Sequence, residues 1–145
     1  MIKDREQLVI TPRNLSRFGS VTIAEGQTEV DEEHVQMTLR YVPASAYKLN
    51  TKPHVAALDA GLLKFPLKLR SWQEGDWFVP LGMNGKKKIS DFLIDKKIPA
   101  NLKAKTLVLV SDQSIVWIAG HRLDNRFKVT EKTEQVLEIS LKRTS

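Results

Sequence analysis

The strongest constraint on the fold is a pair of apolar runs that only two residues separate. TLVLVS (106–111) and SIVWIAG (114–120) each have the length of a β-strand, and Asp112 and Gln113 lie between them. Short runs rich in Val, Ile and Leu that flank a polar turn are typical of a β-hairpin. We therefore predict an antiparallel pair here, with Trp117, in the middle of the second run, buried in the core.

Further strands are predicted in the first half of the chain. SVTIAE (20–25) and VQMTLRYV (35–42) alternate between apolar and polar residues, which is the pattern of a half-buried strand. EQLVI (6–10) and VAALDA (55–60) are additional candidates. The strongly acidic EGQTEVDEE (25–33) is expected to be an exposed turn.

The second half of the chain also contains predicted strands, and their polar positions carry more basic residues. The segment 64–72 has one apolar and one basic face, and QEGDW (73–77) is expected to turn at Gly75. RFKVT (126–130) and QVLEISLK (135–142) are predicted to form another antiparallel pair.

One short helix is predicted between these strands. The apolar residues of ISDFL (89–93) lie three and four positions apart, as on one face of a helix. Ser90 is expected to cap its start, and Pro99 disfavours helix at the residue before it, so the helix should cover about 90–97. The predicted fold class is α+β, with mostly antiparallel strands.

Charge is distributed unevenly along the chain. Residues 1–65 carry 8 basic and 8 acidic side chains, whereas residues 66–145 carry 15 basic and 9 acidic ones, so the second part holds the whole net charge of +6. Together with a turn at Gly61, this shift indicates a boundary near 61–66, between a β-rich N-terminal subdomain and a C-terminal domain. An anionic partner and a solvated lysine-rich face both explain the 7 lysines and 2 aspartates of residues 86–105.

Composition excludes several classes of protein. A content of 41% hydrophobic and 28% charged residues is ordinary for a globular protein. The absence of cysteine excludes disulfides, thiolate zinc sites and cysteine nucleophiles, and His34, His54 and His121 lie too far apart to predict a metal site. No apolar run of about 18 residues and no signal-peptide core are present, so we expect a cytoplasmic protein without a membrane partner.

The segment GMNGKKKISDFLIDKKIP (82–99) is the most distinctive motif. It is not a P-loop, because Lys87 stands where the template needs Ser or Thr, and Pro80 where it needs Gly. Lys96 and Lys97 fall at the carboxyl end of the predicted helix, where cations are favourable. Lysines 86–88 precede its amino end, where cations are unfavourable unless an anion is bound.

Other charged and aromatic residues have two interpretations each. HRLDNRF (121–127) is either a charged face in which Asp124 pairs with an arginine, or a second set of phosphate contacts. Trp72 and Trp77 either belong to the core or stack on unpaired bases. Asp76 is expected to cap backbone N–H groups of its turn rather than to act in catalysis.

In order and spacing, these motifs resemble the C-terminal substrate-binding domain of tRNA(Ile)-lysidine synthetases. The resemblance covers about residues 66–140. The matching residues are Arg70, Gly75, Asp76, Phe78, Pro80, Gly82, Met83, Gly85 to Lys88, Asp91 to Leu93, Pro99, Ile115 to Trp117, Gly120, Arg122 and Asp124.

The resemblance implies a role in tRNA modification. Enzymes of this family are ligases that use ATP to attach lysine to the wobble cytidine of an isoleucine tRNA with a CAU anticodon. Their chemistry belongs to an N-terminal adenylating domain with a Ser-Gly-Gly-x-Asp-Ser loop, which this sequence lacks. ATP and magnesium are therefore implied only for that missing domain, and we predict no catalytic residue here. The resemblance also implies a fold related to part of the phenylalanyl-tRNA synthetase β subunit.

We accordingly predict a module that binds tRNA through its phosphates and positions it for the catalytic domain. The expected contacts are Lys86, Lys87, Lys88, Arg70, Arg122 and Arg126. The expected structural residues are Gly75, Asp76, Gly82, Gly85 and Asp124. Two alternatives belong to other classes: a protein-interaction or dimerisation module, with 35–42 as a possible dimer edge, and a small stand-alone enzyme.

Overall fold

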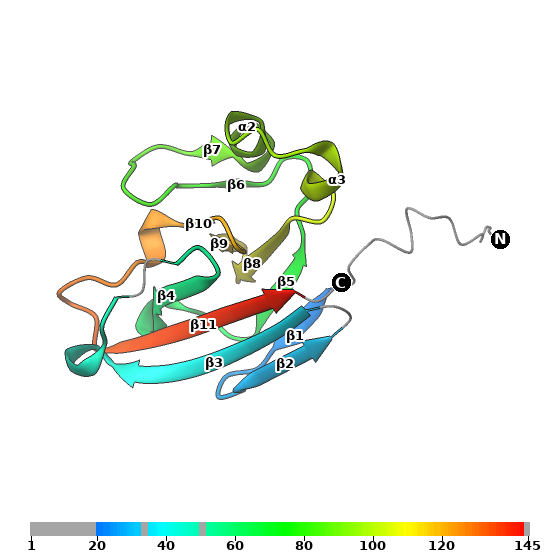
Figure 1. Cartoon of the computed structure of the whole chain (residues 1–145). Helices are drawn as coiled ribbons and strands as arrows, with labels where there is room; N and C mark the ends of the chain where they lie inside the picture. The colour runs from blue at the N-terminus through cyan, green and yellow to red at the C-terminus, as the bar shows by residue number, and fades with distance from the viewer. Residues whose placement is uncertain (1–19, 33–34, 50–51, 144–145) are drawn as a thin grey trace.

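The computed structural model describes residues 20–32, 35–49 and 52–143, and it stacks two β-sheets under a small helical layer (Figure 1). The first sheet has the strand order β1-β5-β8-β9-β10, the second β2-β3-β11-β4, and β6 and β7 form a separate two-stranded ribbon. The strands are β1 Val21–Ile23, β2 Glu29–Glu32, β3 Val35–Pro43, β4 Val55–Asp59, β5 Leu67–Ser71, β6 Trp77–Phe78, β7 Lys87–Lys88, β8 Leu107–Ser111, β9 Ser114–Ile118, β10 Arg122–Leu123 and β11 Gln135–Arg143. The helices are α2 Ile89–Asp95 and α3 Ala100–Lys103, with 3-10 turns at Ala44–Ala46, Ala60–Leu62 and Asn125–Phe127.

The predicted hairpin is confirmed as β8 and β9, which pair antiparallel. Asp112 in the connecting turn has a φ of +57°, a left-handed conformation that Asp tolerates better than most residues. Nearly every residue of both strands is buried, because the five-stranded sheet is covered on both faces. This double burial explains why the two runs are apolar throughout rather than alternating.

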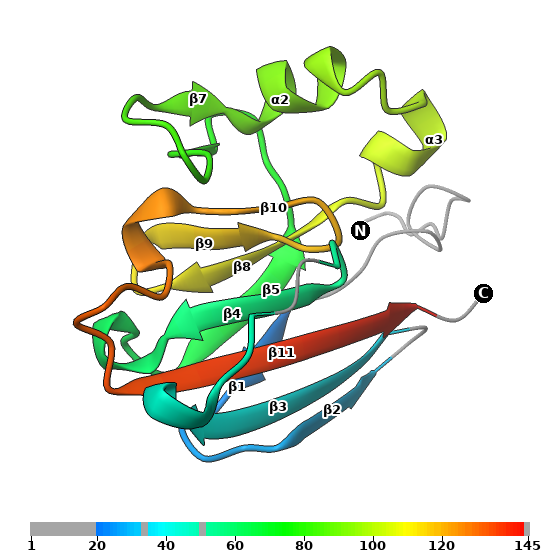
Figure 2. The ribbon, with the colours of Figure 1, turned by 60° about the vertical axis from the view of Figure 1, so that its left-hand side comes forward.

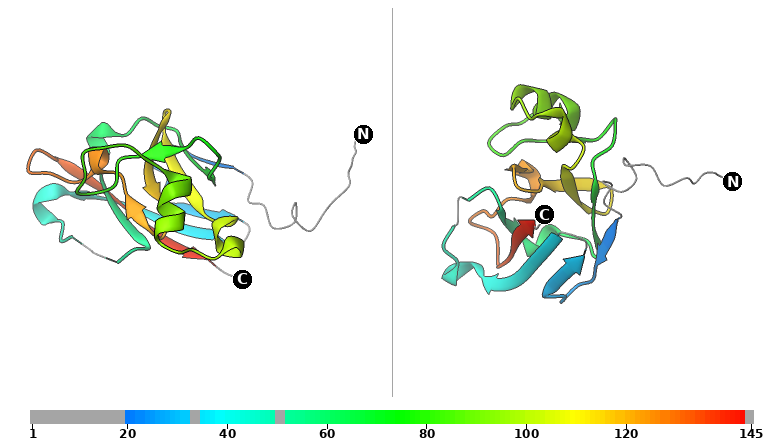
Figure 3. Two further views of the ribbon diagram at one scale, coloured as in Figure 1. Left: turned by 90° about the horizontal axis from the view of Figure 1, so that it is seen from above. Right: turned by 45° about the vertical axis from the view of Figure 1, so that its right-hand side comes forward.

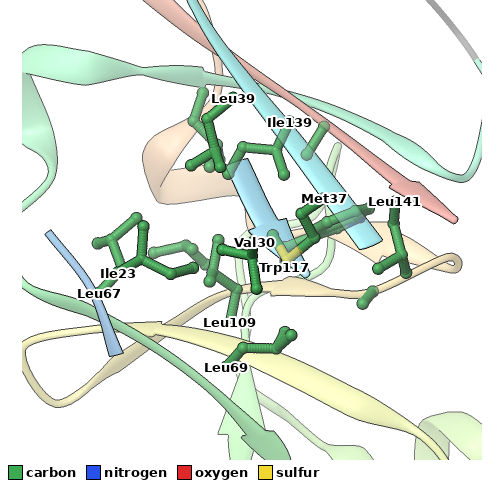
Figure 4. Packing of buried hydrophobic residues seen from close by; sticks show 14 of the residues in the cluster. Ile23, Val30, Met37, Leu39, Leu67, Leu69, Leu109, Trp117, Ile139 and Leu141 are labelled. Atoms are coloured by element: carbon green, nitrogen blue, oxygen red, sulfur yellow. The ribbon is translucent and has the colours of Figure 1, made fainter. Parts of the chain in front are cut away.

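Two apolar clusters lie on the two faces of the five-stranded sheet, and Figure 4 shows part of the larger one. The larger fills the space between the two sheets and includes Trp117, which is 1% exposed as predicted. The smaller joins Phe78, Phe92 and Leu93 to the hairpin face that carries Val108. The helix therefore packs onto the hairpin, and this contact fixes the position of the lysine segment just before it.

The pairing predicted for the C-terminal segments is wrong. Residues 126–130 form no strand, apart from a single bridge between Lys128 and Leu58. Instead β11 lies between β3 and β4, with Ile139 opposite both Leu39 and Ala56. These partner strands are distant in the sequence, so no local sequence pattern indicates that they pair.

The helix prediction is correct in place and inexact in detail. Helix α2 spans Ile89–Asp95, and its N-cap is Lys88 rather than Ser90, which lies within the helix. Lys97 adopts a φ of +56° after the helix has ended. The short α3 was missed because its ANLK sequence offers a single turn without an apolar stripe.

Three further expectations concern the first half of the chain. The acidic segment 25–33 contains β2, which pairs with β3, so it is not simply a turn. Strand β3 is consequently interior to its sheet and offers no free edge for a dimer. The candidate 6–10 lies outside the described residues.

The boundary proposed near residues 61–66 does not coincide with a break in either sheet. Strand β1 pairs with β5, and β3 pairs with β11, so strands from both sides of the boundary share each sheet. The fold class is as predicted, with mostly antiparallel strands and few helices. Along the described ranges, no helix is long and apolar enough to cross a membrane.

Candidate nucleic-acid interface

The three predicted lysines lie at the junction of the β6–β7 ribbon and α2. Lys87 pairs with Phe78, and Lys88 with Trp77, across the ribbon. The segment borders an open hollow of about 540 Å³. Its lining residues are Met83, Gly85, Lys86, Lys87, Lys88, Asp91, Ile94 and Asp95.

The three lysines differ in what they contact. The Lys86 ammonium lies 4.3 Å from the centre of the Trp77 ring, within the range of a cation–π interaction. Lys87 forms an ion pair with Asp95 at the end of α2. Lys88 is exposed, and no ion pair or hydrogen bond of its side chain occurs within the described part of the chain. The run KKK therefore supplies two available cations and one that already has an anionic partner.

Arg70 is held by Asp76 in a two-point ion pair. Its Nη1 and Nη2 donate to Asp76 Oδ2 and Oδ1 at 2.8 and 3.1 Å. Asp76 Oδ2 also accepts from the backbone N–H of Gln73, and the Asp76 carbonyl accepts from Ile89 N at the start of α2. Gly75 in this turn has a φ of +93°, which favours glycine. Asp76 thus caps its turn as predicted and joins β5 to α2.

Asp124 is completely buried and connects two loops. Its carboxylate accepts from the backbone N–H groups of Val79 and Arg126 at 2.9 and 2.7 Å. It also accepts from Arg126 Nε and Nη2 at 3.0 and 2.9 Å. The guanidinium of Arg126 lies 4.8 Å from the Trp77 ring centre. The pairing of Asp124 with an arginine is therefore present, but at a buried site instead of a solvated face.

Arg122 and Gly82 hold the same loop from the other side. Arg122 Nη2 donates to the Leu81 carbonyl at 2.6 Å, and Gly82 N donates to Asn125 Oδ1 at 3.0 Å. Gly82 has a φ of +87°, whereas Gly85 shows no such conformation and is exposed. These contacts fix the chain just before the lysines.

The six predicted cations therefore fall into two groups. Lys86 and Lys88 have no carboxylate partner in the described part of the chain; Lys86 lies over the Trp77 ring, and Lys88 is opposite Trp77 across the ribbon. The other four are engaged within the fold: Lys87 pairs with Asp95, Arg126 with Asp124 and Arg70 with Asp76, and Arg122 donates to the Leu81 carbonyl. The role of Asp95 was missed, and its spacing of eight residues from Lys87 gave no signal because the two lie on different elements.

His121 gives the stability a dependence on pH. Partial burial of its ring, and then the charges of Lys96 and Arg143, lower the pKa of His121 from its ordinary value of 6.5. The unfolded chain therefore binds this proton at a higher pH than the folded chain. The contribution of neutral His121 to stability is complete above about pH 6.5 and is lost as the pH falls below it.

We expect His121→Gln to lose this part of the pH dependence. Free energies of unfolding, measured by urea denaturation at about pH 7.5 and about pH 5.5, should fall less for the variant than for the wild type. An equal fall in both proteins would contradict the assignment.

Comparison with known proteins shows to which family the chain belongs. Residues 67–140 match the model of the TilS substrate C-terminal domain. The chain belongs to this family. The tRNA(Ile)-lysidine synthase of Parabacteroides distasonis is 37% identical over 142 residues, which cover 97% of this chain and 32% of that protein. The tRNA(Ile)-lysidine synthase of Bacteroides thetaiotaomicron is 34% identical over 133 residues, covering 92% and 30%.

The fold of the TilS C-terminal domain agrees with this assignment. A crystal structure of a TILS C-terminal domain superposes with a TM-score of 0.66 at 18% identity, covering 77% of this chain and 86% of that one. The resemblance read from the motifs is thus confirmed. The chain spans about a third of the length of the curated relatives it matches. The kinship with the phenylalanyl-tRNA synthetase β subunit stays a prediction.

Proposed function

We propose that this chain is the tRNA-binding C-terminal portion of a tRNA(Ile)-lysidine synthase, which positions an isoleucine tRNA with a CAU anticodon for modification. The observation that carries the proposal is the family match over a segment in which Lys86 and Lys88 present their ammonium groups to solvent beside Trp77. Cations of this kind contact phosphates and fix the orientation of a nucleic acid without reading its sequence.

The resemblance to lysidine synthases implies ATP and magnesium for the whole enzyme. The described residues contain no group of three or more His, Cys, Asp or Glu side chains arranged to hold a metal. The Gly85-Lys86 segment also fails the nucleotide-loop pattern. We propose that ATP and magnesium bind another region of the whole protein, since this chain corresponds to about a third of the length of the lysidine synthases it matches, and that this chain contributes tRNA binding.

A salt titration tests the proposal. Fluorescence anisotropy with a labelled CAU-anticodon isoleucine tRNA should give an association constant that falls linearly with salt on logarithmic axes. A second tRNA of different anticodon should bind about as tightly, because phosphate contacts are independent of sequence. Absence of binding at about 50 mM salt, or a salt slope near zero, would refute the proposal.

The competing class is an interaction module. Its basic surface would dock on an acidic protein surface, or the chain would self-associate. Analytical ultracentrifugation with and without tRNA separates these outcomes: a monomer that forms a complex only with tRNA supports the proposal, and a stable homodimer that does not bind tRNA supports the alternative.

A further inference from the structure

Phe92 of α2 lies between two basic side chains, and a third is anchored nearby on the loop that precedes β8. Lys96 follows the helix, His121 lies in the turn between β9 and β10, and Arg143 ends β11. Figure 2 shows the end of β11 and the turn between β9 and β10 on the same side of the molecule, below α3. The left panel of Figure 3, seen from above, likewise shows the end of β11 on the side of α3.

Each of the three side chains has a contact that fixes its position, and the Phe92 ring links two of them. The Lys96 ammonium lies 5.8 Å from the centre of the Phe92 ring, and the His121 ring centre lies 6.4 Å from the same ring. Arg143 Nη1 donates to the Lys105 carbonyl at 2.6 Å, which anchors the end of β11 below α3. The positive charges of Lys96 and Arg143 both act on His121 and lower its pKa.

Among the described residues, no carboxylate pairs with this cluster. Within residues 20–32, 35–49 and 52–143, carboxylates pair with Arg40, Arg70, Lys87 and Arg126, and with none of the three clustered side chains. The helix carboxyl end accounts for one nearby cation, Lys96. The helix end does not account for the other two side chains. His121 lies in the turn between β9 and β10, and Arg143 lies at the end of β11. Lys96 and Arg143 are two permanent positive charges that act on one imidazole without a carboxylate partner in the described residues, and such an arrangement favours an external anion.

We propose that Lys96, His121 and Arg143 form a second phosphate-contact site for RNA, separate from the lysines at the amino end of α2. The proposal rests on the proposed tRNA-binding function. Ammonium, guanidinium and imidazolium groups all donate charge-assisted hydrogen bonds to phosphate oxygens. All three side chains reach solvent.

The distance between the two sites suits one RNA strand. Helix α2 contains 7 residues and is therefore about 10 Å long. A phosphate backbone that runs along α2 would contact Lys86 and Lys88 at one end and the cluster at the other. The second site would then fix the orientation of the RNA on the domain. One phosphate contact allows the RNA to rotate about that point, whereas two separate contacts do not.

A matched pair of variants tests the second site. Lys96→Gln/Arg143→Gln removes two permanent charges from it. Lys48→Gln/Lys132→Gln removes two exposed charges at the opposite end of β11, where Ala44 N donates to the Glu134 carbonyl. Strand β11 has 9 residues, so its ends lie about 30 Å apart.

In the tRNA titration, the site variant should lower the magnitude of the salt slope by about 1.5 to 2, and the control variant should leave it unchanged. An equal loss in both variants would mean that only overall charge matters and would overturn the proposal. A wild-type chain that binds tRNA while the site variant keeps the full slope would overturn the second site alone. A wild-type chain that does not bind tRNA would refute the proposed function itself.

A measurement on the unmodified chain provides an independent test. The imidazole signal of His121, assigned by its loss in His121→Gln, is followed by NMR across the pH range with and without saturating tRNA. A phosphate near the ring stabilises the imidazolium, so tRNA should raise the pKa of His121. An unchanged pKa in saturating tRNA would overturn the site.

Discussion

Replacing Asp124 by alanine should lower the free energy of unfolding by about 3 kcal/mol or more. The carboxylate is completely buried and accepts four hydrogen bonds, two of them from the backbone N–H groups of Val79 and Arg126. Its removal leaves those two donors without a partner and releases the Arg126 guanidinium. Domains of this size are stable by only about 5–15 kcal/mol, so the loss is a large part of the total.

Thermal unfolding measures this effect directly. A change of this size should lower the Tm by roughly 10 °C for a chain of this length. The control is Asp95→Asn, which breaks the ion pair with Lys87 at an aspartate that is 61% exposed and should therefore change stability by less than about 1 kcal/mol. If the two variants melted within about 2 °C of each other, the buried carboxylate would not have the structural role assigned to it.

Replacing Lys86 and Lys88 by alanine should weaken tRNA binding by about ten- to a hundredfold at 0.1 M salt and reduce the magnitude of the salt slope by about 1.5 to 2. Both ammonium groups are exposed and have no carboxylate partner in the described part of the chain, so each can displace counterions from a phosphate. Lys87→Ala should have a smaller effect than either, because Asp95 already neutralises that side chain.

Asp95→Asn provides the complementary change. It frees Lys87 without altering the lysine run and removes a negative charge from the edge of the hollow. Binding should tighten and the slope should become steeper by up to about one. Equal losses for Lys86→Ala, Lys87→Ala and Lys88→Ala would show that the ion pair seen in the fold does not distinguish the three lysines.

Much of the fold was predictable because its signals are local. The two apolar runs and the polar turn of the β8–β9 hairpin lie within residues 106–120, and the alternation of β3 and the apolar stripe of α2 are equally compact. The pairing of β11 with β3 and β4 was not predictable in this way. It joins residues about a hundred positions apart, such as Leu39 and Ile139, and the neighbouring segment 126–130 offered a plausible but wrong partner.

The candidate site was likewise predictable only in part. The sequence alone determined that a lysine run precedes a short helix, that a Gly-Asp turn lies before it, and that these motifs belong together in the TilS C-terminal pattern, since all are matters of residue type and spacing. Only the tertiary structure decided which cations are available. Asp95 neutralises Lys87, Asp76 holds Arg70, and buried Asp124 holds Arg126.

The cluster of Lys96, His121 and Arg143 depends on tertiary structure even more strongly. Its members come from three elements, and Arg143 bonds to the carbonyl of Lys105, 38 residues away. The physical reason is that a charge pair or charge cluster depends on distance and burial. Chain folding sets both through contacts between remote residues, whereas the periodicity of a sequence reports only which face of one element is buried.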